Sequence, residues 1–491
     1  MALLTVALTA CRCPAEPADA DPRALAERID RHFAVRWAKA NVRPADLADD
    51  AEFQRRVTLD LIGRIPTVAE ARAFQRETAP DRRRRLIDRL LDHPGYAGRF
   101  ARFWGERWLP QGDAQFENLK PQFLDWLRER LRENAPYHRM AREVLGAPED
   151  DRRGAALRLF LQANEFKPEN LAASVSRLFL GVSLECAQCH DHPSAAWKRD
   201  QFWDFAAFFA SGPEPIDPGT RRQASPRFPD GTAPNRIDDA PAARRRVLAD
   251  WLTDGRNPYF ARNAVNVLWA AFFGTSLADS LDDANAIRDP ELLDELAEAF
   301  ARHDFDLKFL IRAIALSRVY QLGSAGPADA PDPRLFARAA VRPLSGDALY
   351  DSLLTATGLD EQSLAPPSAY GQPDVPPRKA FLAFFARGDG PAGSRRTILQ
   401  ALLMMNGRLT GEAVDLEHGR TLASVAEAPF WSTPRKLEAL YLAALGRPPR
   451  PAERDRLAAY VEGGGPRKDP KHALADVFWA LLNSSEFGVN H

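Results

Sequence analysis

The spacing of apolar residues predicts helices along almost the whole chain. Apolar residues recur every three or four positions in one segment after another, for example in DRRRRLIDRLLD at 81–92 and YAGRFARFWGERWL at 96–109. This spacing gathers them on one face of a helix, whereas the strict alternation of a half-buried strand is nearly absent. The 39 prolines divide the pattern into short elements, and Gly446 and Pro448 predict the end of a helix at 433–445. The fold class that follows is mostly α-helical.

Three stretches rich in proline and glycine interrupt the helical pattern. Residues 213–240 lack periodicity, and we interpret them as the linker between a helical domain at 22–212 and a second helical domain at 241–491. The stretches at 321–334 and at about 359–395 indicate long irregular loops, the latter an insert in the second domain. A hydrophobic fraction of 45% is ample for a core in each domain.

The first 20 residues predict export from the cytoplasm. ALLTVALTA at 2–10 is too short to span a bilayer and suits the apolar region of a secretory signal. The tetrapeptide at 8–11 looks like a bacterial lipobox, which would make Cys11 a lipidation site, and 18–20 offers an alternative cleavage site. We expect a periplasmic or cell-envelope protein that meets the membrane only through such a lipid anchor. A cytoplasmic protein with a chance apolar start is the alternative.

The charge balance argues against nucleic acid as a partner. Lys and Arg number 66 against 67 Asp and Glu, a net charge of −1. The run Arg82–Arg85 fits the solvated face of a helix, because acids flank it on both sides. Gly388–Gly393 matches G-x-G-x-x-G, but Pro391 removes a backbone donor and no βαβ rhythm surrounds it, so we discount dinucleotide binding.

The segment LECAQCHDHP at 184–193 carries the strongest chemical signal. Cys186, Cys189 and His190 form C-x-x-C-H, the pattern of c-type haem attachment. Two thiols at this spacing add to the two vinyl groups on one edge of the porphyrin, and the adjacent histidine ligates the iron. A Cys186–Cys189 disulfide is an alternative, as is a metal site that also uses His192.

The sequence does not assign the second axial ligand of such a haem. His192 is too close in sequence to cross the haem plane, so it fits a supporting position or an alternative metal site, and Asp191 could orient a neighbouring imidazole. Other histidines and methionines fit ordinary core or surface positions better than ligation: Met140, His138, His303, Met404 and Met405. Four tryptophans could line a sugar platform but also fit the core better: Trp104, Trp108, Trp197 and Trp203.

The chain resembles a known pair of domain families without established activity, which occur in planctomycetes and related bacteria, often downstream of a cytochrome-c-like domain. The first family is matched by RVTLDLIGRIPT at 56–67, by residues 86–104, and by FLGVSLECAQCHDHPSAAW with the FWDFAAFFA that follows it. The second is matched by 257–274, 282–300, 307–322, 440–453 and 480–491. The resemblance implies a secreted, helical two-domain protein. Two departures are Ser194 in place of an aromatic residue, and Val267 in place of the arginine of the family's Asn-Arg-x-Trp, which stands here at 266–269.

These observations lead to one main functional hypothesis and two alternatives. The main one is an exported c-type haem redox protein, which transfers electrons to a redox partner or oxidises an envelope substrate. The first alternative is a non-enzymatic envelope module that binds a partner or polysaccharide, with Cys186 and Cys189 joined in a disulfide. The second is a metal-dependent hydrolase built around His190, Asp191 and His192.

Overall fold

The computed structural model describes most of the chain: residues 21–109, 114–148, 154–192, 195–238, 240–281, 286–326, 332–361, 364, 376–385 and 397–491. Over these residues the protein is mostly α-helical, as the apolar spacing predicts. The described part contains one sheet of two short antiparallel strands, β1 (Arg342–Pro343) and β2 (Val489–Asn490). The signal segment at 1–20, with Cys11, and the glycine pattern at 388–393 lie outside the described residues.

Except for the helix at Ala155–Ala163, the helices of the first half of the chain lie in segments whose apolar spacing predicts a helix. They are α1 (Pro22–Lys39), α2 (Asp50–Ile62), α3 (Val68–Arg76), α4 (Arg82–Asp92), α5 (Pro94–Trp108), α6 (Ala114–Arg132), α7 (Tyr137–Leu145), α8 (Ala155–Ala163), α9 (Pro168–Val175) and α10 (Arg199–Ala206). Three short elements accompany them: a π-helical turn, η2 (Ser176–Leu180), and two 3-10 turns, η3 (Glu185–Gln188) and η4 (Ala207–Phe209).

The second half is equally helical. Its elements are α11 (Pro241–Leu252), α12 (Phe260–Phe273), α13 (Pro290–Arg302), α14 (Leu307–Leu316), α15 (Arg318–Gln321), η6 (Pro333–Leu335), α16 (Gly346–Thr357), α17 (Pro377–Ala383), α18 (Ile398–Asn406), α19 (Arg408–Ala413), α20 (Arg420–Ala426), α21 (Thr433–Leu445), α22 (Pro451–Glu462) and α23 (Pro470–Leu482). The sequence pattern did not predict α8 or α20, and α17 lies inside the stretch expected to be irregular.

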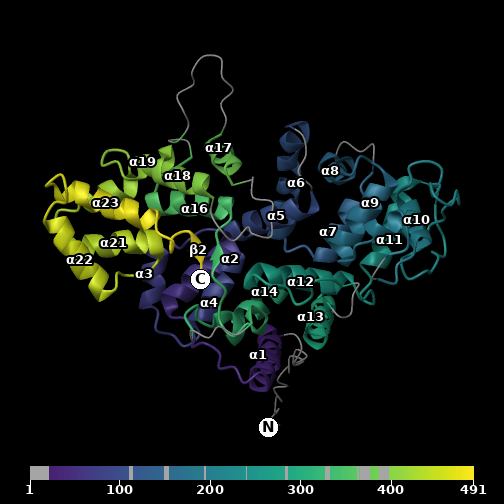
Figure 1. Ribbon diagram of the computed structural model, residues 1–491, viewed down its shortest axis with the longest axis horizontal. Coiled ribbons are helices and arrows are strands. Elements are labelled where there is room, and N and C mark those ends of the chain that lie inside the picture. Colours follow the sequence, from purple (N-terminus) through teal and green to yellow (C-terminus); the bar gives the residue numbers. More distant parts are fainter. Residues whose placement is uncertain are drawn as a thin grey trace, which may run out of the picture.

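Two hydrophobic cores organise these helices. The larger core extends in sequence from Leu25 to Ala337. The smaller one combines residues between Leu349 and Phe487 with Leu59 and Ile65 from the start of the chain. In Figure 1 the helices α16–α23 form one end of the molecule and α6–α11 the other, with α1, α2, α4, α5 and α12–α14 between them. Within the described residues, no helix combines the length and apolarity needed to cross a membrane.

The segment at 213–240 is irregular, as expected, but it is firmly packed. Phe228 stacks on Phe208 and on Trp251, with ring centroids 5.1 and 4.9 Å apart. The larger core is therefore continuous across this segment. The domain limits placed on either side of it stay a prediction.

Two arginines of α2 connect the larger core to the C-terminal part of the chain. Arg55 donates hydrogen bonds to the carbonyl oxygens of Ala444 (3.2 Å) and Phe487 (2.9 Å). Arg56 donates to the carbonyl oxygens of Tyr320 (2.6 Å) and Leu322 (2.7 Å) in the larger core and to that of His491 (3.0 Å) at the C-terminal end. It also donates to the carboxylate of Glu52 (2.7 Å). Both side chains are almost completely buried, and we refer to the pair as the carbonyl clamp. It is supported by Leu59 and Ile65, which belong to the smaller core although they lie on or just after α2.

A buried carboxylate completes this junction. Asp60 accepts two hydrogen bonds from Arg342 (2.9 and 3.0 Å), one from the Tyr320 hydroxyl (2.8 Å) and one from the Asn490 amide (2.8 Å). These donors come from β1, α15 and β2, so Asp60 fixes α2 against the small sheet. A buried charge requires such a complete set of partners, because desolvation is costly without them.

Candidate functional site

The C-x-x-C-H segment begins after a sharp change of chain direction at Gly181. This glycine has φ +67° and ends η2, where the N–H of Val182 donates to the carbonyl of Ser176 (3.1 Å). A Cβ at this position would lie 2.7 Å from Oδ1 of Asn263, which itself donates through its amide to the carbonyl of Leu178 (2.7 Å). Both the backbone conformation and the close approach of α12 therefore require glycine here.

The segment itself lies on the surface with its thiols outward. Leu184 and Ala187 are buried in the larger core, whereas Cys186 and Cys189 are exposed free thiols. The indole N–H of Trp203 on α10 donates to the carbonyl of Gln188 (3.2 Å) and holds η3 against that helix. The buried residues on either side of the thiols anchor the segment, so that Cys186 and Cys189 lie exposed on a fixed support.

The imidazole of His190 is oriented by the backbone. Its Nδ1 lies 2.7 Å from the carbonyl oxygen of Asp191, and both residues are exposed. Because a carbonyl oxygen can only accept, Nδ1 must carry the proton in this hydrogen bond. In the neutral ring Nε2 then carries the lone pair, which is the tautomer needed for ligation of a metal through Nε2.

Asp191 is held by the start of α10. Its carboxylate accepts hydrogen bonds from the backbone N–H of Arg199 and from Nζ of Lys198, each 3.0 Å long. These two donors, in that order, lower the pKa of Asp191 below its ordinary value. The carboxylate is thus committed to fixing the loop and remains charged at neutral pH.

A buried ion pair beneath the loop fixes it further. Arg199 donates through Nε to Asp217 (2.9 Å) and through Nη1 to the carbonyl of Cys189. Asp217 has no solvent exposure and also accepts from the Thr220 hydroxyl (2.7 Å) and the Gly219 N–H (2.8 Å). Burial alone would raise the pKa of Asp217, but the hydrogen bonds from Thr220, Gly219 and Arg199 outweigh it and lower it to about 2.

His192 is placed within the turn that follows the motif. Its ring Nδ1 accepts a hydrogen bond from the backbone N–H of Ala195 (2.9 Å). The backbone N–H of His192 donates to the carbonyl of Trp197 (2.8 Å). Within the part of the chain that the structure describes, no group of three or more His, Cys, Asp or Glu side chains could hold a metal ion. His192 thus holds the turn through Nδ1, and its role as a supporting group or an alternative metal ligand stays a prediction.

The candidates for a second axial ligand are engaged in other parts of the molecule. Met140 is buried in the larger core and Met404 in the smaller one, while Met405 follows Met404 on α18 at the opposite end of the molecule (Figure 1). His138 and His303 each pack against a phenylalanine ring, with centroids 5.0 and 3.6 Å apart. Their positions agree with the ordinary roles expected from the sequence.

The tryptophans proposed as a sugar platform belong to the protein interior. Trp104, Trp108 and Trp203 are buried, and Trp197 is half-buried against Tyr259. The arginine run at 82–85 is bound to acids, as expected of a solvated helix face: Arg82 and Arg83 pair with Asp50. Ser194, the departure beside the motif, lies outside the described residues.

The residues of the segment fit covalent haem as donors but do not enclose it. Two free exposed thiols two residues apart and an imidazole with an available Nε2 form the required donor set. The side chains flanking them are charged, as at Asp191 and Lys198, and the apolar side chains of the segment point into the core. A porphyrin held here would lie on the surface with an exposed edge.

The fold and the site together define a helical protein with two cores and a surface C-x-x-C-H segment. Residues 28–214 match the family model described as "PSCyt2: Protein of unknown function (DUF1549)", and residues 244–381 match "PSD1: Protein of unknown function (DUF1553)". The chain belongs to these paired planctomycete-type families, as the resemblance implies. No curated protein and no solved structure matches the chain.

Sequence reasoning missed the residues that position the motif. Arg199 and Asp217 lie 18 positions apart, and the latter falls in a stretch interpreted as a surface linker. The available signal was local: Asp217-Pro218-Gly219-Thr220 offers a carboxylate followed by a turn, hydroxyl and N–H donors that can converge on it. The pairing with Arg199 had no local signal.

Proposed function

We propose that Cys186 and Cys189 attach haem c through thioether bonds, that His190 ligates the iron, and that the protein transfers electrons in the cell envelope. The observation that carries the proposal is the pair of free, exposed thiols beside an imidazole whose Nδ1 is bound to the Asp191 carbonyl. When bound, haem supplies a reversible one-electron couple at its iron.

The exposed position of the segment favours electron transfer over oxidation of a small substrate. Oxidation of a small molecule needs an enclosed, shaped pocket beside the iron, and here charged side chains such as Lys198 flank the motif. An exposed porphyrin edge, by contrast, suits contact with a redox partner. The proposal therefore selects the first of the two redox activities that the sequence suggests.

The chain's own groups hold the motif in register for attachment. The Asp191 carbonyl fixes the tautomer and orientation of the His190 ring, and Arg199 bridges the Cys189 carbonyl to buried Asp217. Preorganisation of this kind reduces the conformational entropy lost when the ligands close on one group. These residues are positioning residues and do not contact the iron.

Expression with the haem-attachment machinery in the periplasm of a bacterial host tests the proposal. We expect a pyridine haemochrome spectrum of covalently bound haem after denaturation, and a mass increase of one haem per chain. The Cys186→Ser/Cys189→Ser double variant should lose both signals. Glu185→Gln is the matched control, because it changes an exposed side chain next to Cys186 and leaves the thiols and imidazole intact.

Three outcomes would contradict the proposal. Unmodified thiols would exclude covalent haem, an intact Cys186–Cys189 disulfide would favour the binding module, and stoichiometric zinc or iron without porphyrin would favour the hydrolase. A positioning variant sharpens the test: Asp217→Asn should lower the yield of attached haem while the far-ultraviolet circular dichroism stays that of the parent. An unchanged yield would remove Asp217 from the argument.

A further inference from the structure

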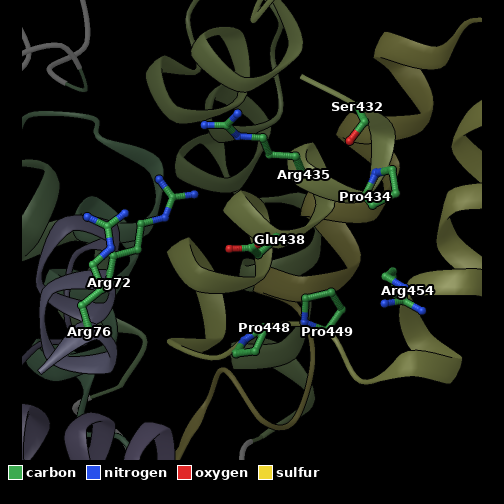
Figure 2. A pocket seen from close by; sticks show the side chains of 9 residues that line it. All are labelled: Arg72, Arg76, Ser432, Pro434, Arg435, Glu438, Pro448, Pro449 and Arg454. Atoms are coloured by element: carbon green, nitrogen blue, oxygen red, sulfur yellow. The ribbon is translucent and has the colours of Figure 1, made fainter. Parts of the chain in front are cut away.

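A groove of about 520 Å³ lies between α3 and the α21–α22 pair, at the opposite end of the molecule from the C-x-x-C-H segment (Figures 1 and 2). Its volume is in the range of sites for small molecules. The lining residues come from both walls and from the loop between α21 and α22: Arg72, Arg76, Ser432, Pro434, Arg435, Glu438, Pro448, Pro449 and Arg454.

The charge of this groove is strongly positive. Among its described lining residues are four arginines and a single carboxylate, Glu438, so the lining carries a net charge of +3 in a chain whose total is −1. Figure 2 shows Arg72 and Arg76 on one wall, with Glu438 projecting toward them from α21. A concentration of one sign of charge in a concave surface attracts ligands of the opposite sign.

The carboxylates next to the groove are already bound by other arginines. Arg64 holds both oxygens of Glu70, at 2.8 Å each. Arg447 holds Glu453 (2.8 and 3.1 Å) and Glu486 (2.6 and 2.8 Å). These acids are thereby withdrawn from the groove. Of the lining arginines, Arg454 is paired with Asp455 (2.9 Å), so the positive charge left for a ligand comes from Arg72, Arg76 and Arg435.

The groove arginines differ from these neighbours in their contacts. Arg72, Arg76 and Arg435 form no ion pair with any carboxylate of the described residues. Arg435 and Arg72 instead approach the ring of Trp431, with Cζ 4.7 and 6.0 Å from its centroid. A cation over an aromatic face is held in place while its N–H donors stay available at the ring edge.

The start of α21 adds to this field. Ser432 is the N-cap residue of this 13-residue helix, yet its side chain makes no capping hydrogen bond, and both Ser432 and Pro434 line the groove. A helix N-terminus carries a partial positive charge and N–H groups without partners in the helix. It reinforces the attraction for an anion that the arginines already exert.

We propose that this groove binds a small ligand with two oxyanion groups, phosphate or sulfate, joined directly or through a hydroxylated middle. One oxyanion pairs with Arg72 and Arg76 on α3, and the other with Arg435 at the start of α21. Glu438 projects between these walls (Figure 2), so it excludes a third negative charge there and accepts a hydrogen bond from a hydroxyl group. The site is independent of haem binding at Cys186–His190.

Calorimetric titration of the full chain with sodium pyrophosphate tests this assignment. We expect binding that is at least ~10-fold tighter than that of inorganic phosphate, because each oxyanion gains charge-assisted hydrogen bonds. Arg72→Gln and Arg435→Gln should each weaken the affinity for pyrophosphate roughly 5–10-fold, and Glu438→Gln should strengthen it. The matched control is Arg31→Gln on α1, which removes the same charge from a side chain 69% exposed.

The outcomes separate a built site from general charge attraction. No binding of pyrophosphate, or equal affinity for phosphate and pyrophosphate, would overturn the proposal. An equal loss of affinity in Arg31→Gln and Arg72→Gln would also overturn it, because the effect would then follow the net charge alone. A sugar bisphosphate and a disulfated disaccharide, titrated in parallel, distinguish phosphate esters from sulfate esters as the source of the oxyanions.

Discussion

Two groups of arginines lie where the two cores meet, and their surroundings are opposite. Arg55 and Arg56 of the carbonyl clamp are buried and donate to main-chain carbonyls on distant parts of the chain. Arg72, Arg76 and Arg435 of the groove are half-buried or exposed and form no ion pair with a described acid. The two groups therefore differ in their hydrogen-bond acceptors. Arginines with acceptors inside the protein stabilise the fold, and arginines without a carboxylate partner are available to a ligand.

The clamp shows what the fold requires before it can bury such a charge. Burial lowers the pKa of Arg55 to about 10, so the side chain stays protonated at neutral pH. Its Nη1 and Nη2 donate to carbonyl oxygens at the end of α21, just before β2 and in β2 itself. These oxygens carry a partial negative charge and do not titrate. Arg55 thus joins the two cores through main-chain carbonyls, whereas Arg56 also pairs with the carboxylate of Glu52 (2.7 Å).

Of the substitutions proposed for these arginines, Arg55→Ala, which removes half of the clamp, should destabilise the protein most. Arg55→Ala leaves buried carbonyls of Ala444 and Phe487 without a donor and opens a cavity. We expect the free energy of unfolding to fall by roughly 3–5 kcal/mol, measured by urea denaturation. Hydrogen exchange at the backbone amides of β2 should also accelerate, because Arg55 binds the carbonyl of Val489.

The matched variant comes from the groove. Arg76→Gln removes the same charge from an exposed side chain that has no ion pair with a described acid, so we expect a change of less than about 0.5 kcal/mol. If both variants lost the same stability, the division between structural and available arginines would be wrong.

The second prediction concerns the turn that joins the clamp to the groove. Gly446 lies between Ala444, whose carbonyl Arg55 binds, and the prolines of the groove floor; its φ is +72°. A Cβ there would lie 3.4 Å from Cγ of Pro66. This distance is an ordinary van der Waals contact, so the backbone decides the effect. Gly446→Ala should lower the free energy of unfolding by about 1–2 kcal/mol, because an L residue is strained at this positive φ.

Two measurements sharpen this prediction. Gly411→Ala on α19 is the control, since a Cβ there meets nothing within 4 Å, and we expect it to be neutral or to stabilise the helix by up to about 1 kcal/mol. Pyrophosphate affinity should fall in Gly446→Ala and not in Gly411→Ala. Loss of stability without loss of affinity would show that the turn supports the clamp alone.

The sequence was sufficient where local pattern decides the structure. Gly446 ends α21 in the left-handed conformation, as a glycine after a periodic segment predicts. Phe202, Phe205 and Phe209 are buried, as their spacing indicates. The helices that were missed include α8 and α20, of nine and seven residues.

The sequence was insufficient where distant residues must meet. Arg55 binds a carbonyl 389 positions away, and carbonyls have no identity in a sequence. The motif at Cys186–His190 could be read directly, but not the buried Asp217 that holds it through Arg199. The groove is a similar case, because Arg72 and Arg435 are neighbours only after α3 and α21 pack against each other.

The smallest predicted effect is the loss of stability in Glu453→Gln. Its dependence on pH distinguishes a nearby ion pair from the carbonyl clamp. Hydrogen bonds from Arg447 hold the pKa of Glu453 at about 2, against 4.5 for an ordinary glutamate. Because the folded pKa is the lower one, the stabilisation is fully present above about pH 4.5 and is lost as pH falls toward about 2. Glu453→Gln should therefore cost about 1 kcal/mol at neutral pH, since the pair is partly exposed, and this cost should shrink in acid.

The carbonyl acceptors of the clamp do not titrate, so Arg55→Ala should lose the same stability at about pH 7 and at about pH 3. Urea denaturation of both variants at the two pH values gives the comparison directly. A pH-independent loss in Arg55→Ala together with a shrinking loss in Glu453→Gln separates the two kinds of arginine contact. If the loss in Arg55→Ala also shrank in acid, the clamp would depend on a nearby carboxylate such as Glu486, whose charge contributes to the field at Arg55.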